Sequence, residues 1–203
     1  MDIKTLEETV SILERELNLP SGFLSGLKSE DDWPFIIKAH AFLEALFTHV
    51  LIKSIGNEEL RDIFSRLEMS NKNTGKAEFA RALGLIDKDG FRFITKFSEL
   101  RNLLVHDIGK VNFNFSEYVS RMDKNQFKSF VDSFAYFASE EELSIRRETV
   151  NELLRADPKL SVWYSIMHFT GVIYWKREVT ILKRDVVILR RVNRALLNND
   201  ELE

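Results

Sequence analysis

The chain has 203 residues, 44% of them hydrophobic and 30% charged, values that are typical of a globular protein with one sizeable core. The absence of Cys excludes disulfides, Cys-ligated zinc and a thiol nucleophile. The formal net charge of -3 gives no general attraction to nucleic acid, so such binding requires a local basic patch. Only 3 Pro and 8 Gly favour long helices over a turn-rich β fold.

No targeting signal is evident in the sequence. The opening residues, MDIKTLEE, lack a basic stretch followed by an apolar run. The segment that most resembles a membrane span, 160–175, is interrupted by Ser, His, Thr and Gly. It falls short of the roughly 18 continuous apolar residues that a spanning helix needs. We therefore expect a cytoplasmic protein with no membrane contact.

Helical periodicity dominates the first half of the chain. Apolar residues at positions 6, 10, 13 and 17 predict a helix over 2–17, which Pro20 ends. The Asp-Asp-Trp-Pro stretch at 31–34 is typical of a helix start, and the helix that follows, 33–55, is apolar on most sides. We expect this helix at the centre of the protein. Short helices over 57–67 and 76–85 then lead to a turn at 87–90.

A line of polar residues runs along the central helix at helical spacing. It consists of His40, Glu44 and Thr48. Either this line lies at a partly hydrated helix edge, or Glu44 holds a cation from another helix, since an unpaired buried charge is costly. His40 and Glu44 are also spaced like metal ligands, but two ligands make a poor site, so we expect a structural role and no bound metal or cofactor.

Helices continue to the C-terminus. A short extended segment at 111–115 precedes helices over 116–122 and 124–138, and a charged helix over 140–157 is stopped by Pro158.

The last segment, 160–197, is one long helix or two helices broken at Gly171. Apolar residues at 179, 182, 186, 189 and 192 approach the spacing of a coiled-coil seam. A pair of helices, within one subunit or between two subunits, is enough to explain this pattern. Basic residues outnumber acidic ones here, which indicates an RNA-attracting stripe or, more simply, a solvated helix face.

The helix predicted over 91–107 holds the densest group of reactive side chains: Arg101, Asn102 and His106, followed by Asp107. On an ideal helix, Asn102 and His106 share a polar line with Thr95 and Glu99, opposite the apolar stripe of Phe93, Phe97, Leu100 and Leu104.

Arg101 lies beside the apolar stripe instead. It diverges from His106 by about 140°, so the two meet one phosphate only if Arg101 bends around the helix or a second subunit completes the site.

These residues suit RNA cleavage by the substrate's own 2′-OH. Histidine transfers protons near neutral pH, and the arginine fork binds phosphate oxygens. Asn102, one turn before His106, can orient the ring or contact the phosphate. A structural interpretation stays open: His106 interacts favourably with the C-terminal end of a helix, and Arg101 is an interior strut paired with Glu44.

The Arg-Asn-Leu-Leu-Val-His motif resembles the R-x4-H motif of the HEPN superfamily. Residues 74–86, which end in Ala-Leu-Gly-Leu-Ile, together with the apolar helix carrying Glu44, are similar to its mannitol-repressor-like branch. The resemblance covers roughly residues 30–120. It implies an all-α, HEPN-like helical bundle over 1–140, with 141–203 as a C-terminal helical extension that packs on the same core or is used in dimerisation.

The resemblance also implies a function. Many members are homodimeric, metal-independent endoribonucleases of toxin–antitoxin or defence systems, with two motifs facing each other. Others, including the mannitol-repressor-like branch, are regulators or binding modules. Catalytic roles would fall to Arg101, Asn102 and His106, and we expect Glu44, Glu99 and Asp107 to support them. The expected partners are RNA, a second copy, and an antitoxin or regulatory protein.

Overall fold

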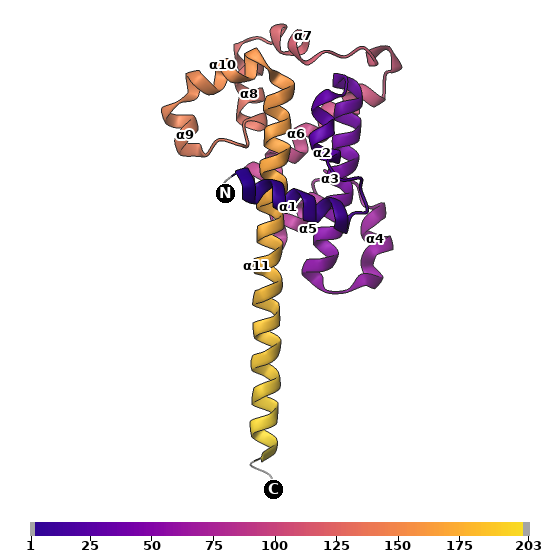
Figure 1. The fold of residues 1–203 in the computed structure, drawn as a ribbon, viewed down its shortest axis with the longest axis vertical. Helices are drawn as coiled ribbons and strands as arrows, with labels where there is room; N and C mark the ends of the chain where they lie inside the picture. The colour runs from indigo at the N-terminus through magenta and orange to yellow at the C-terminus, as the bar shows by residue number, and fades with distance from the viewer. Residues whose placement is uncertain (1–2, 201–203) are drawn as a thin grey trace.

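A computed structural model describes the backbone of residues 3–200 and the side chains of residues 4–139 and 141–194. This part of the chain contains α-helices and 3-10 turns and no β-strand, which confirms the predicted all-α class. Helices α1 to α10 and the first half of α11 form one bundle, and the second half of α11 projects from it (Figure 1).

The α-helices, in chain order, are α1 (Ile3–Glu16), α2 (Phe23–Gly26), α3 (Asp32–Ile55), α4 (Arg61–Arg66), α5 (Lys76–Ala82), α6 (Lys88–Val105), α7 (Phe115–Ser120), α8 (Lys124–Phe134), α9 (Glu140–Ile145), α10 (Arg147–Ala156) and α11 (Pro158–Asp200). The 3-10 turns are η1 (Leu27–Ser29), η2 (Glu58–Leu60) and η3 (Ile108–Lys110).

Helix α3 forms the centre of the bundle, as its composition predicts. It packs against α4, α5, α6 and α11. Among the described helices, α3 alone is long and apolar enough to cross a membrane, and 72% of its most apolar window is buried inside the protein. The most lipid-like segment is thus α3, and not residues 160–175 as expected. Burial on several sides accounts for this composition.

Helix α6 begins earlier than the sequence pattern suggests. Residues 87–90 were expected to be a turn, but Asp87 is the N-cap of α6, and its Oδ1 accepts a hydrogen bond from the Gly90 amide at 2.8 Å. Asp after a short loop is typical of both a turn and a cap, because its side chain accepts from nearby amides in each. The cap places the motif in the last turn of α6.

Two other expectations for the middle of the chain were wrong. Residues 111–115 form no β-strand: 111 and 112 lie in a turn, the extended Asn114 caps α7, and the Phe115 amide donates to Asp32 Oδ2 at 2.7 Å. The charged segment 140–157 is divided into α9 and α10 at Arg146.

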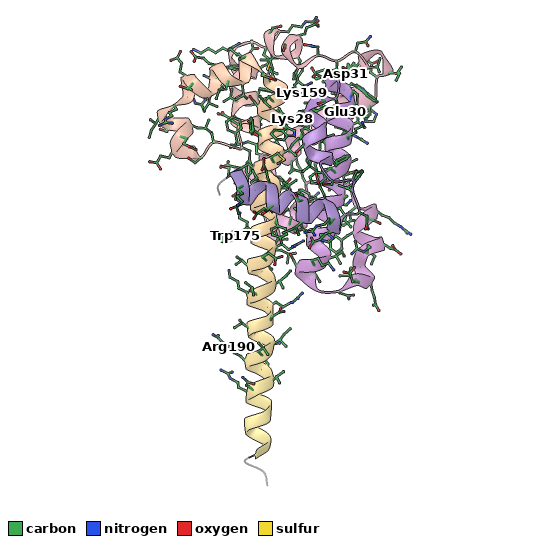
Figure 2. All side chains as sticks on the ribbon, viewed as in Figure 1. Lys28, Glu30, Asp31, Lys159, Trp175 and Arg190 are labelled. Carbon is green, nitrogen blue, oxygen red and sulfur yellow. The ribbon has the colours of Figure 1, made fainter. Side chains whose placement is uncertain are left out.

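Helix α11 is continuous over 43 residues. Pro158 ends α10 but also starts α11, where a missing amide hydrogen costs nothing. Gly171 causes no break and is buried. At the start of α11, Lys159 Nζ donates to the Glu30 carbonyl at 2.9 Å and lies 3.3 Å from Asp32 (Figure 2). The first half of α11 therefore belongs to the same core as residues 1–140.

An ion pair between a buried arginine and a partly exposed glutamate joins α11 to α1. Arg177 of α11 donates from Nη1 to Glu16 Oε2 at 2.6 Å, and His49 Nε2 lies 2.9 Å from the same oxygen. Burial raises the pKa of the Glu16 carboxyl, but hydrogen bonds and charges from Arg177 and His49 outweigh it, so that pKa lies below its usual value. The ion pair is thus intact at neutral pH.

We expect Glu16→Ala to lower the free energy of unfolding, because among the described residues it leaves the buried Arg177 with the partly exposed Glu178 as its single acidic partner. About 2 kcal/mol is expected, less than for a fully buried pair because Glu16 is partly hydrated. Urea denaturation measures the loss. The control is Glu58→Ala, which removes an exposed carboxylate and should change little; equal losses in the two variants would contradict a special role for Glu16.

Candidate functional site

The Arg101–His106 motif lies at the C-terminal end of α6. The helix ends at Val105, and His106 is its C-cap, with its amide donating to the Asn102 carbonyl at 3.3 Å. Asn102 and His106 are exposed, and Arg101 is half-buried. The side chains thus occupy the two environments that the helical periodicity indicates, with the histidine accessible to a ligand.

The Arg101 side chain bends around the helix toward the polar side. Its Nη1 donates a hydrogen bond to Asn102 Oδ1 at 3.1 Å. Asn102 precedes His106 by four residues, which places the two side chains on one face, a single turn apart. The guanidinium therefore reaches the polar line of His106 although the Arg101 backbone lies in another quarter of the helix.

The proposed strut between Arg101 and Glu44 is not formed. Within the described residues, no ion pair of up to 4.0 Å joins them; Glu44 instead approaches His40 Nδ1 at 3.8 Å. Burial lowers the pKa of Lys76 on α5, and the charge of Glu44 partly offsets this. Glu44 is itself partly exposed. Glu44 thus lies at a partly hydrated helix edge, and among the described residues no cation from another helix forms an ion pair with it; Lys76 Nζ donates instead to the Ser65 carbonyl at 3.3 Å.

His40 is a buried neighbour of the motif. Its Nε2 lies 3.2 Å from Ser98 Oγ, and its ring stacks on Phe97. Burial, together with the charges of Arg101 and Lys76, lowers the pKa of His40 to about 4, so the ring is neutral at pH 7. Within the described residues, no three or more His, Asp or Glu side chains gather as metal ligands.

The two other supporting residues make local contacts. Glu99 pairs with Lys96 at 2.7 Å, and Asp107 caps η3 by accepting from the Gly109 amide at 3.0 Å. Lys110 was not identified from the sequence: its Nζ donates to the Leu103 carbonyl at 3.2 Å and lies 3.8 Å from Asp107. The sequence signal that could have identified Lys110 is its position four residues after His106, because cations are stabilised near the C-terminal ends of helices.

A groove of about 980 Å³ runs along the neighbouring side of α6. Its apolar lining includes Leu100, Leu104, Phe130 and Phe134, and its polar lining includes Lys96, Glu99, Lys110 and Arg121. The three motif residues lie outside this lining, while Glu99 and Lys110 belong to it. The Arg101–His106 motif therefore lies on an open surface beside the groove. Within the described part of a single chain, the motif side chains are not enclosed by a pocket.

The low pKa of His40 predicts a pH-dependent stability. The folded-state pKa of about 4 lies below the ordinary 6.5, so the unfolded chain binds more protons between these values and stability falls on acidification from pH 6.5 to 4. The expected loss is up to about 3 kcal/mol. His40→Gln should reduce this slope in denaturation curves recorded across that range; His49 and His168, whose pKa values burial also lowers, account for a remaining slope of the same sign. If stability falls as steeply with acidification in the variant as in the wild type, the pH dependence comes from groups other than His40.

Comparisons with protein-family models, with curated proteins and with solved structures found no match to this chain. The role of the motif is therefore argued from its own geometry and chemistry.

Proposed function

We propose that the protein binds RNA and cleaves it without a metal ion, through attack of the 2′-OH on the adjacent phosphate. In this reaction His106 transfers the proton as general acid or base, Arg101 binds the phosphate, and Asn102 connects the two. The observation that carries the proposal is the hydrogen bond from Arg101 to Asn102, because it brings the guanidinium to the side of α6 that exposes His106.

The chemistry requires proton transfer and neutralisation of phosphate charge. An exposed imidazole supplies the first near neutral pH, and a guanidinium supplies the second through paired hydrogen bonds. One nitrogen of Arg101 is used by Asn102, which leaves other N–H groups of the fork for phosphate oxygens. Lys110 adds a second cation close to the end of α6. The groove beside the motif offers space for the flanking nucleotides.

A second candidate function is favoured by a different observation. The projecting half of α11 exposes large apolar side chains, including Leu182, Val186 and Leu189. Such a surface suits a non-catalytic transcriptional regulator or protein-interaction module, as in the mannitol-repressor-like branch. A deletion that tests this role must start after Arg184, because residues from Pro158 onward contribute buried side chains to the core. Loss of partner binding without any nuclease activity would favour this candidate.

The nuclease proposal is tested with purified protein and a mixed-sequence RNA in the presence of EDTA. We expect cleavage that leaves 2′,3′-cyclic phosphate ends, and a rate that His106→Ala lowers by about 100-fold or more. Arg101→Ala should lower the rate as well, since it removes the phosphate contact.

The control is Arg66→Ala, which removes the same charge from an exposed position on α4 and should leave the rate unchanged. Wild-type protein that leaves RNA intact, or cleavage that persists in both motif variants, would refute the proposal.

A further inference from the structure

Helix α11 carries a regular apolar stripe that starts beside the body and continues into its projecting half. Trp175, Leu182 and Leu189 are 58%, 64% and 62% exposed, and Val186 is also exposed. With the half-buried Val179, the steps along this stripe are four, three, four and three residues. This alternation is the heptad repeat of a coiled coil, with Val179 and Val186 at position a and Trp175, Leu182 and Leu189 at position d.

The stripe faces away from the body because the opposite side of the helix is bound to it. Arg177 pairs with Glu16, and Arg184 donates from Nη1 to the carbonyls of Lys53 and Ser54 at 3.2 and 3.4 Å. Arg184 lies two residues from both Leu182 and Val186, which is about 200° around the helix. In Figure 2, Trp175 lies on α11 beside the body, and Arg190 lies along the part that projects from it. The apolar stripe is therefore exposed at Trp175 and again from Leu182 onward, with Val179 half-buried between them.

The identity of the seam residues favours a second copy in parallel orientation. Valine at a together with leucine at d is the combination that selects two-stranded parallel coiled coils. The next a position is Asn193, which is exposed. A single Asn at an a position fixes register and restricts assembly to a dimer, because it is satisfied by the same Asn of a second helix.

Charges beside the seam indicate the same arrangement. Glu178 and Asp185 occupy positions g, and Lys183 and Arg190 occupy positions e. In a parallel in-register pair, each g residue faces the e residue five positions later on the other helix, so Glu178 meets Lys183 and Asp185 meets Arg190.

An antiparallel pair would place g against g and e against e, where like charges meet. Among the described side chains of one chain, each of these carboxylates forms an ion pair with the arginine before it and with no other cation, and both remain partly exposed.

We propose that residues 175–193 of α11 form a parallel, in-register, two-stranded coiled coil with a second copy of the chain. The seam spans about 27 Å. It begins where Lys176 binds Asp87, the N-cap of α6, while His106 lies at the other end of that 18-residue helix. The seam and the motif are thus separate surfaces, and the dimer does not depend on the proposed nuclease activity.

Cysteine cross-linking tests orientation and register, because the natural chain has no Cys. Leu182→Cys and Leu189→Cys, made separately, should each convert most of the protein to a disulfide-linked dimer under mild oxidation. An antiparallel pair meets its own copy at only one point along the helix and therefore cannot cross-link at both positions. The control is Ile188→Cys, which is similarly exposed at position c and should stay monomeric on a non-reducing gel.

Charge exchange tests the pairing in solution by sedimentation. Lys183→Glu with Arg190→Glu places four acidic residues beside the seam and should weaken self-association by about tenfold or more. Glu178→Lys with Asp185→Lys should do the same, and an equal mixture of the two variants should restore the dimer.

The proposal is overturned if the wild-type chain sediments as a monomer at micromolar concentration. It is equally overturned if only one of the two d-position cysteines cross-links, or if both charge variants associate as strongly as the wild type.

Discussion

The structure depends on covering α3. A 24-residue helix with apolar side chains on most sides is stable in water only if other helices surround it, and this requirement arranges the bundle. Helices α4, α5, α6 and α11 meet it together, although they come from distant parts of the sequence. Between them, Phe169 of α11 packs against both Phe47 of α3 and Phe93 of α6.

Covering α3 uses only part of α6 and of α11, and the remaining surface of each helix is exposed. Helix α6 buries Phe93 and Phe97 against the core and presents Asn102 and His106 where that contact ends. Helix α11 buries its first half, including Phe169 and Ile173, and then continues past the body. Both candidate functional surfaces therefore arise where a core helix leaves the core. One is polar and suited to an anionic substrate, and the other is apolar and suited to a helix.

Much of the fold could be predicted because periodicity and capping are local properties. The range of α3 and its central place follow from its composition, its Asp-Pro start and Gly56 at its end. Helix breaks were harder to predict, since Asp87 and Pro158 suit both a boundary and a helix start. At the motif, the divergence of Arg101 from His106 follows from helical geometry. The bend of Arg101 to Asn102 does not, because a long side chain chooses among rotamers by its tertiary surroundings.

The unbroken course of α11 through Gly171 has a consequence for how the chain tolerates change. One rigid helix carries both core contacts and the exposed stripe, so the direction in which the stripe points is set by the packing of residues such as Ile166 and Ile173. Inserting a single residue after Arg184 would turn everything beyond it by about 100° and interrupt the stripe without touching the core. Inserting seven would restore its phase to within about 20° and only lengthen the projection.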